Sequence, residues 1–340
     1  MPTIRSQPPR GLSAIILAAG KGTRMKSDLP KVCHPIGGRA MVCAVMDACI
    51  EAGVDHIVVV VGHRKDDVIE ALQPYFATTT FGPDLEPGPR IAQVAPSAVA
   101  AHVRVDIAHQ DIQDGTGHAV WQARPPFDQI LLGRAPARDV FVLCGDGPLI
   151  RAQTLRRMLD RHRSGGTPGG HEASHLGLEG GNDRGGVYGV CATLATSVIA
   201  DPTGYGRIVR DAAGRFERIV EHKNATEAQR AIREVNPSYY LFDTVALFDA
   251  VTQVTPNEAS GEYYLTDVFQ IMLAEGQRVE VIDAVPAEDV LSINTPEQLA
   301  EVDAIFRSRQ GAKVVGGGPG GAGSSDSTSS AGPSRRGAGA

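Results

Sequence analysis

Continuous apolar stretches alternate with segments of helical periodicity over the first half of the chain. The apolar stretches, which are typical of buried parallel strands, occupy residues 12–19, 56–61, 103–107 and 139–144. Apolar positions recur at helical spacing at residues 40–52, 66–72 and 117–124. This alternation predicts a doubly wound, mostly parallel α/β sheet of Rossmann-like type, with ligands bound at the carboxyl ends of the strands.

The second half changes in character and predicts a smaller, more antiparallel lobe. Short strands between glycine-rich turns are expected at residues 187–194, 207–210, 216–221 and 238–242. Helical spacing returns at residues 244–251, 265–274 and 295–308. We therefore expect one bilobed catalytic domain over residues 12–310. It consists of a first lobe (about 12–165), a second lobe (about 187–290) and a closing helix (295–308). A flexible N-terminus (1–11) precedes the domain, and a disordered Gly/Ser tail (311–340) follows it.

Composition and charge exclude several classes of protein. The 340 residues are 42% hydrophobic and 21% charged, an ordinary globular balance. The net charge of −6 provides no basic field for nucleic acid or an anionic membrane, so neither partner is expected. No apolar run approaches the ~20 residues that span a bilayer, and the first residues resemble no signal peptide. Five cysteines without CxxC spacing favour a reduced, cytoplasmic protein.

A glycine-rich loop follows the first predicted strand and is the candidate phosphate site. It is neither a Walker A loop, because Gly22 stands where Ser or Thr must follow Lys21, nor a dinucleotide fingerprint, because Met25 replaces the third glycine. An ordinary strand-to-helix turn would explain the glycines. It would not explain the cations Arg24 and Lys31, which favour a loop that binds a triphosphate.

The loop sequence LAAGKGTRMKSDLPKV resembles the signature of sugar-phosphate nucleotidyltransferases, in particular bacterial uridylyltransferases that act on N-acetylglucosamine 1-phosphate. Four later segments match that family in order: residues 113–118, 145–149, 201–208 with 219–223, and 261–267. The resemblance extends from about residue 13 to about residue 307. It implies a nucleotide lobe followed by a sugar-binding lobe.

The resemblance also implies roles for individual residues. Arg24 and Lys31 would be catalytic, and Asp146 and Asn294 would hold Mg²⁺, an ion that prefers hard oxygen ligands. The nucleotide would contact Leu17, Ala18, Ala19, Gly20, Gln110, Gly115, Thr116, Cys144, Gly145 and Asp146. The sugar would contact Gly206, Glu221, Asn236, Tyr264, Thr266 and Asn294. From the residues alone, Asp146 and Asn294 could instead cap helices, and most of the others could be ordinary polar or turn positions.

The implied reaction transfers UMP from UTP to N-acetyl-α-D-glucosamine 1-phosphate and gives UDP-N-acetylglucosamine and pyrophosphate, for amino-sugar and peptidoglycan precursor synthesis. The alternatives are the same chemistry on another sugar 1-phosphate or nucleotide, or a non-catalytic sensor of sugar nucleotides. Bifunctional family members continue into a β-helix acetyltransferase, and this chain ends instead in a Gly/Ser tail. Acetyl-coenzyme A is therefore not an expected partner.

Two further features weigh on the resemblance. Cys144 stands where the family usually has an aromatic residue, which affects the expected fit around Asp146. His171 and His175 spell the HExxH zinc motif, but glycines and a proline surround it and oppose the helix that zinc chemistry needs. We therefore expect a surface insertion there, within residues 164–186, and a second insertion at 73–101.

Overall fold

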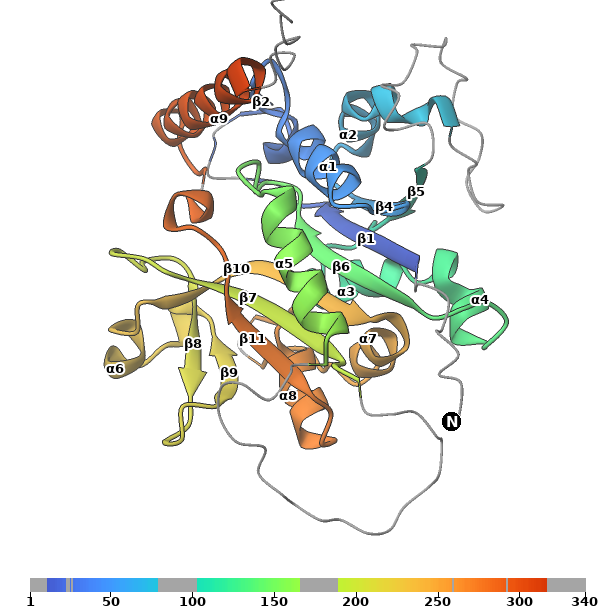
Figure 1. The fold of residues 1–340 in the computed structure, drawn as a ribbon, viewed down its shortest axis with the longest axis vertical. Helices are drawn as coiled ribbons and strands as arrows, with labels where there is room; N and C mark the ends of the chain where they lie inside the picture. The colour runs from blue at the N-terminus through green and yellow to red at the C-terminus, as the bar shows by residue number, and fades with distance from the viewer. Residues whose placement is uncertain are drawn as a thin grey trace, which may run out of the picture.

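The computed structural model describes residues 11–22, 25, 27–78, 103–165, 189–258, 260–291 and 293–316. Four parallel strands form one half of its sheet: β1 (Gly11–Ala18), β4 (His56–Val61), β5 (Arg104–His109) and β6 (Arg138–Cys144). They correspond to the predicted apolar runs, because a strand covered on both faces needs apolar side chains on both. The order β6-β1-β4-β5 brings their carboxyl ends to one edge (Figure 1).

The strands of the second half continue this sheet instead of forming one of their own. They are β7 (Ala192–Val198), β8 (Gly206–Arg210), β9 (Phe216–Val220), β10 (Glu234–Asp243) and β11 (Val279–Asp283). Strand β10 pairs antiparallel with both β6 and β7, whereas β11 is parallel to β7. The β8–β9 hairpin branches from the start of β10. The predicted α/β fold is confirmed, and its more antiparallel part is an extension of the same nine-stranded sheet.

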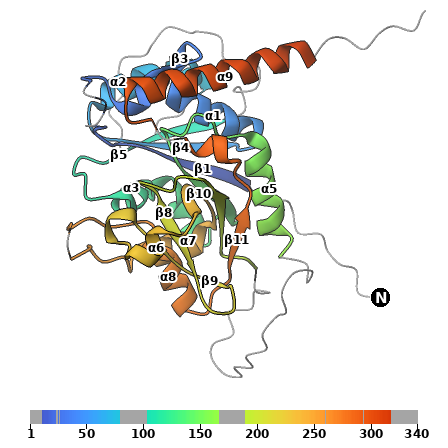
Figure 2. The ribbon, with the colours of Figure 1, turned by 90° about the vertical axis from the view of Figure 1, so that its left-hand side faces the viewer.

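Helices cover both faces of the sheet. Their bounds are α1 (Met41–Glu51), α2 (Lys65–Ala71), α3 (Thr116–Gln122), α4 (Asp128–Leu131), α5 (Ala152–Arg163), α6 (Glu227–Arg230), α7 (Thr244–Val251), α8 (Asp267–Ala274) and α9 (Pro296–Gly316). Figures 1 and 2 show α5 on one side of β6 and α3 on the other. Alternate residues of β1 follow this division: Ala14 and Ile16 pack in the core below α1 and α5, and Ile15 packs in the core below α3, α7 and α8.

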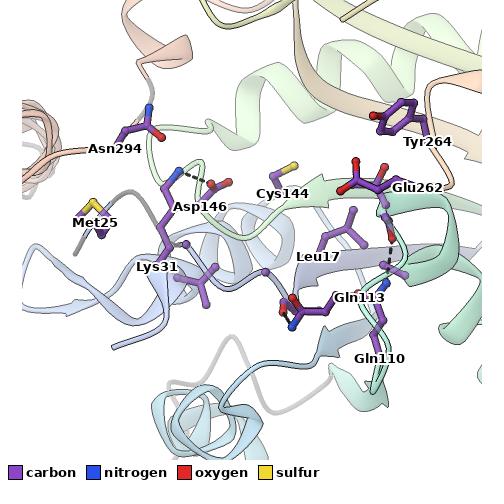
Figure 3. A pocket seen from close by; sticks show the side chains of 17 residues that line it. Leu17, Met25, Lys31, Gln110, Gln113, Cys144, Asp146, Glu262, Tyr264 and Asn294 are labelled. Atoms are coloured by element: carbon purple, nitrogen blue, oxygen red, sulfur yellow. Dashed lines mark hydrogen bonds and ion pairs between the residues drawn. The ribbon is translucent and has the colours of Figure 1, made fainter. Parts of the chain in front are cut away.

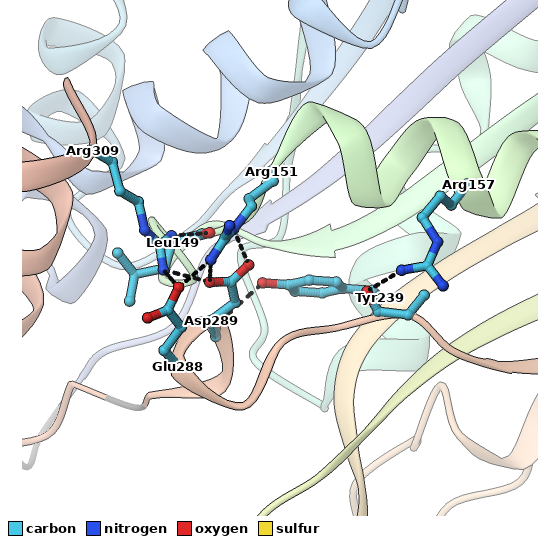
Figure 4. A network of polar contacts seen from close by, with 8 residues as sticks. Leu149, Arg151, Arg157, Tyr239, Glu288, Asp289 and Arg309 are labelled. Atoms are coloured by element: carbon cyan, nitrogen blue, oxygen red, sulfur yellow. Dashed lines mark hydrogen bonds and ion pairs between the residues drawn. The ribbon is translucent and has the colours of Figure 1, made fainter. Parts of the chain in front are cut away.

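Helix α9 packs on a third, smaller core at the end of the molecule that carries β2 (Pro35–Ile36) and β3 (Arg39–Ala40). A buried carboxylate fixes it there (Figure 4). The Asp289 side chain is 1% exposed and pairs with Arg151 at 2.7 Å and with Arg309 of α9 at 2.6 Å. The exposed Glu288 contacts the same two arginines. This network ties α9, and with it the segment around Asn294, to the start of α5.

Several boundaries differ from the sequence-based expectations. Helix α9 extends to Gly316, past the predicted end at residue 308, and the strand expected at 187–194 begins at Ala192. Helix α5 was expected only in the alternative in which Asp146 caps a helix that begins near Leu149, and strand β11 was not predicted. The HExxH segment and most of both expected insertions lie outside the described residues. Among the helices that the structure describes, none is long and apolar enough to cross a membrane.

The carboxylate of Asp289 should contribute measurably to stability. Asp289→Ala leaves two arginines without their buried partner, and we expect it to lower the free energy of unfolding by about 2 kcal/mol, measured by urea denaturation. Glu288→Ala is the matched control: it removes an acid from the same arginines at a side chain that is 55% exposed, and should cost less than about 1 kcal/mol. Equal losses in the two variants would contradict the role given to Asp289.

Candidate active site

A cavity of about 490 Å³ opens at the carboxyl edge of the sheet (Figure 3). Strands β1 and β6 place its floor, because Leu17 and Cys144 are register partners at the ends of these neighbouring strands. The N–H of Gly145 donates to the Leu17 carbonyl at 2.9 Å and continues the pairing into the loop that carries Asp146. The predicted residues that line the cavity are Leu17, Ala19, Gly20, Lys31, Gln110, Gly115, Thr116, Cys144, Asp146, Tyr264 and Asn294.

The glycine-rich loop enters the cavity and packs tightly on the segment that carries Lys31. Gly22 has a φ of +62°, and a Cβ built on it would lie 2.6 Å from Lys31 Cβ. A side chain at this position would therefore separate the loop from Lys31. Thr23, Arg24 and Lys26 lie outside the described residues, so of the two predicted cations only Lys31 has a described position.

Lys31 and Asp146 form an ion pair at one end of the cavity. Lys31 Nζ lies 2.6 Å from Asp146 Oδ2, and the two side chains are 17% and 34% exposed. Helix α5 begins at Ala152, too far along the chain for Asp146 to cap it. The pair uses one oxygen of the carboxylate and one of the three ammonium protons, which leaves the other Asp146 oxygen and two Lys31 donors for a ligand.

Asn294 lies at the same end of the cavity as the ion pair (Figure 3). Thr295, not Asn294, caps α9: Thr295 Oγ1 accepts from the Gln298 N–H at 3.3 Å, and Gln298 Oε1 accepts from the Asn294 N–H at 2.7 Å. A carboxylate and an amide are hard oxygen donors. In the part of the chain that the structure describes, no three His, Cys, Asp or Glu side chains gather as a metal site. The donor set fits an ion that takes its remaining ligands from water or substrate.

The opposite end of the cavity is shaped by amide groups. The side chain of Gln110, which is buried, donates from Nε2 to the Gly115 carbonyl at 2.9 Å and approaches His118 Nδ1 at 3.3 Å. Its Oε1 accepts no hydrogen bond from any described residue. Gln113 Nε2 donates to the Ala19 carbonyl at 3.0 Å and closes the loop against β1. This end therefore presents a carbonyl oxygen on a braced amide.

Two segments far apart in the sequence form the wall beside Gln110. The Tyr263 N–H donates to the Asp114 carbonyl at 2.7 Å, and the Gly117 N–H donates to the Tyr263 carbonyl at 2.8 Å. Between these bonds Gly115 has a φ of +101°, and a Cβ there would lie 2.5 Å from the Tyr263 carbonyl oxygen. Thr116 Oγ1 accepts from the Leu265 N–H at 3.0 Å. Both the glycine and the threonine thus have structural reasons to be present.

The predicted sugar residues divide into two groups. Tyr264 lines the cavity, while Gly206, Glu221 and Asn236 lie together outside its lining: a Cβ on Gly206 would be 3.5 Å from Asn236 Cβ and 3.6 Å from Glu221 Oε1. The Asn236 amide is used within β10, where it donates to Tyr240 Oη at 2.7 Å and accepts from the Ser238 N–H at 3.0 Å.

Three other predicted contacts also lie outside the cavity lining. Ala18 and Gly145 are core positions that flank Leu17 and Asp146, and Thr266 occupies the N-cap position of α8 without a capping side-chain hydrogen bond.

Burial raises the pKa of two ionisable groups, the Glu221 carboxyl and the Cys144 thiol. It raises the pKa of the Glu221 carboxyl, against the opposing effect of Lys223. It raises the pKa of the Cys144 thiol to about 12, with Asp146 adding to the shift. Cys144 is therefore a neutral thiol near neutral pH, and it lines the cavity as a small apolar group, not as a nucleophile.

A family model described as a MobA-like NTP transferase domain matches residues 14–174. The bifunctional protein GlmU of Heliobacterium modesticaldum is 38% identical over 297 residues, which are 87% of this chain and 52% of that protein. GlmU of Geobacillus thermodenitrificans is 38% identical over 296 residues (87% and 52%), and GlmU of Geobacter metallireducens is 39% identical over 298 residues (88% and 51%).

The chain is therefore similar to nucleotidyltransferases. The resemblance that the loop sequence and the later segments indicated is confirmed. The chain spans about half the length of the curated relatives it matches. A crystal structure of apo UDP-glucose pyrophosphorylase has the same fold, with a TM-score of 0.59 over 88% of this chain and 99% of that chain at 16% identity.

The sequence analysis assigned no role to several residues that line the cavity. Gln113 and Glu262 belong to motifs that carried the resemblance, but no role was predicted for them. Gly22, Met25, Val32 and Ala119 also line it. Their signal was position: each lies within a few residues of a predicted contact, on a loop or at the first turn of a helix.

Gly115→Ala should destabilise the protein more than the replacement of a glycine that merely has a positive φ. We expect a fall of about 3 kcal/mol in the free energy of unfolding, because the substitution combines the strain of a positive φ with a collision against the Tyr263 carbonyl. Gly133→Ala is the control, since Gly133 has a φ of +68° but no atom within 4 Å of its built Cβ, and should cost about 1 kcal/mol. Urea denaturation of both variants gives the difference; a cost for Gly115→Ala no greater than for Gly133→Ala would rule out the close contact.

Proposed function

We propose that this protein is a nucleotidyltransferase, which transfers UMP from UTP to N-acetyl-α-D-glucosamine 1-phosphate in a Mg²⁺-dependent reaction that gives UDP-N-acetylglucosamine and pyrophosphate. The observation that carries the proposal is the Lys31–Asp146 ion pair, at 2.6 Å, in one cavity with Asn294 at the same end and with Gln110 at the other. A triphosphate needs cations and metal ligands at one end of its site and directional hydrogen bonds for its base at the other.

In the proposed reaction, an oxygen of the sugar phosphate forms a bond to the α-phosphorus of UTP while the bond to pyrophosphate breaks. The attacking phosphate is already anionic, so little proton transfer is needed. Lys31 would use its two remaining donors on phosphate oxygens, and Arg24, outside the described residues, would add a second cation. Asp146 and Asn294 would hold Mg²⁺, which when bound supplies charge neutralisation and orients the phosphates.

The base would be read by Gln110. Its amide nitrogen is engaged by the Gly115 carbonyl, so the amide presents Oε1, an acceptor, toward the base. Uracil carries an N3–H donor that matches this oxygen. Cytosine has an acceptor at N3 and would leave two acceptors facing each other, which a buried polar site rejects strongly.

Sugar recognition is the less constrained part of the proposal. Tyr264 and Glu262 line the cavity on the side of the second lobe, and Gly206, Glu221 and Asn236 lie together outside the lining. We propose that Glu221 and Asn236 contact the acetamido sugar when the cavity is occupied. Because these groups are withdrawn from the lining, the same chemistry on another sugar 1-phosphate is the second candidate.

Pyrophosphate release from a panel of NTPs and sugar 1-phosphates tests the activity. We expect UTP with N-acetylglucosamine 1-phosphate to react fastest, with loss of turnover in EDTA and recovery in Mg²⁺. Lys31→Met should lower kcat/KM by about 10²–10³-fold, since it removes one preorganised charge. Lys65→Met on α2, away from the cavity, is the control and should change it less than about threefold. Binding of UDP-sugar without any turnover would contradict the proposed enzyme and favour a non-catalytic sensor of sugar nucleotides.

Base selection gives a second test. Gln110→Leu should lower kcat/KM for UTP by about 10–100-fold, the value of one to three kcal/mol for a lost buried hydrogen bond, and lower that for CTP far less. CTP serves as the internal control, because damage to the Gly115 loop would affect both nucleotides equally. If the ratio of kcat/KM for UTP to kcat/KM for CTP is unchanged, Gln110 does not recognise the base.

A further inference from the structure

A second cavity, of about 400 Å³, lies directly behind the wall of the candidate active site. Its lining comes from α3, from the end of α7 and from the wall itself, and includes Asp114, His118, Trp121, Gln122, Val254 and Tyr263. The function proposed above uses none of the side chains that face it.

The partition between the two cavities is one layer of backbone thick. It consists of the two hydrogen bonds that join Tyr263 to Asp114 and to Gly117, at 2.7 and 2.8 Å. Gly115 and Tyr264 line the active-site cavity, whereas Tyr263 lines the second one. A molecule in the second cavity therefore packs against the same backbone that shapes the base end of the first.

One imidazole lines the second cavity and reaches the base-reading side chain of the first. His118 Nδ1 lies 3.3 Å from Gln110 Nε2, and His118 Nε2 lies 2.8 Å from Gln122 Nε2. Amide nitrogens are donors, and a neutral imidazole accepts at only one of its two nitrogens. His118 can therefore accept from Gln110 or from a group in the second cavity, but not from both. When the Gln122 amide is turned so that its oxygen accepts from a protonated His118 Nε2, His118 Nδ1 carries no proton. This state, in which Nδ1 accepts from Gln110, is the one that Gln122 favours.

The lining defines the chemistry of an occupant. Trp121 and Tyr263 supply aromatic surface, Val254 supplies an apolar contact, and Asp114 supplies a carboxylate. No lysine or arginine is among the described residues that line this cavity, so a phosphate or carboxylate ligand has no counter-charge. Arg124, which lies over the Trp121 ring, has Asp128 as its own partner. A small aromatic ring with an ammonium group matches the surface and the charge, and its ammonium can donate to His118 Nε2 in place of the contact with Gln122.

We propose that the second cavity is a regulatory site for a small cationic aromatic molecule, and that its occupancy changes how Gln110 reads the base. The ammonium donates to His118 Nε2, so the imidazole proton moves to Nδ1, where it faces the amide nitrogen of Gln110. Two donors then oppose each other, and Gln110 must turn or lose its contact. The occupant thereby weakens the acceptor offered to uracil. This consequence rests on the proposed function; the binding site does not.

Binding can be measured at the chain's only tryptophan, Trp121, which lines the second cavity. With excitation at 295 nm, we titrate the full chain with phenethylamine and with 3-phenylpropionate, which share a ring and differ in charge. We expect phenethylamine to bind about fivefold or more tightly than 3-phenylpropionate, the value of a partly exposed ion pair with Asp114. Asp114→Asn should abolish that preference. Equal binding of the two probes, or no change at Trp121, would overturn the site.

A cavity-filling variant separates this site from non-specific binding. Thr252 is exposed at the end of α7 and lines the second cavity, so Thr252→Phe places a ring in the space with little risk to the fold. We expect it to abolish the response to phenethylamine and to leave UTP affinity unchanged. Retained phenethylamine binding in a folded Thr252→Phe variant would place the ligand elsewhere and overturn the proposal.

Calorimetric nucleotide affinities test the coupling without any turnover. Saturating phenethylamine should weaken UTP binding by at least about fivefold, and UTP should weaken phenethylamine by the same factor, because coupling is reciprocal. CTP, which does not need the Gln110 acceptor, should be affected less. Phenethylamine binding with unchanged UTP affinity would overturn the coupling. Failure of UTP to bind at all would instead contradict the proposed function and leave the Trp121 result standing.

Discussion

The parallel pairing of β1 with β6 is the constraint from which the candidate site follows. Because Leu17 and Cys144 are register partners, the two strands end at the same level, and the loops that leave them must occupy the same space. One loop carries the glycines and leads to Lys31, and the other carries Asp146. The ion pair between Lys31 and Asp146 joins residues 115 positions apart that the sheet has already brought together. A slip in this register would turn the side chains to the other face and separate them.

The charged groups in and near the cavity differ in how their environment affects the stability of the folded chain. Lys31 and Asp146 pair with each other in a partly exposed site, where a ligand can compete for either group. Glu221 lies outside the cavity lining, and burial raises the pKa of its carboxyl group. A carboxyl group with a raised folded-state pKa binds its proton more tightly in the folded chain. Stability from this group is therefore present at pH values below its unfolded pKa and is lost as the pH rises through the folded one. Retaining an acid there opposes stability at neutral pH, which supports the sugar contact proposed for Glu221.

Sequence patterns predicted local structure where a single physical cause dominates. The strand at 56–61 is buried on both faces, so its apolar run alone marks both of its ends. Helix α5 was expected only as a stretch that Asp146 could cap, because five of its twelve residues are Arg or His and its apolar face is narrow. Strand β11 was missed because it is short and only half-buried. The continuation of the sheet through β10 depends on pairing between residues about 100 positions apart, as between Leu143 and Tyr239, and no local pattern records it.

The candidate site shows the same division between local and long-range information. Lys31 and Asp146 stand in motifs that could be read from the sequence, whereas the wall that supports Gln110 is made by backbone groups of Asp114, Gly117 and Tyr263. Backbone groups can form hydrogen bonds with each other whatever side chains the residues carry, so few positions in the sequence indicate this wall. Those positions are the glycines: a Cβ at Gly115 or Gly117 would lie 2.5 or 3.1 Å from the Tyr263 carbonyl oxygen. The segment 113–118 therefore contains glycines because two chain segments approach each other closely there, and that approach separates one cavity from the other.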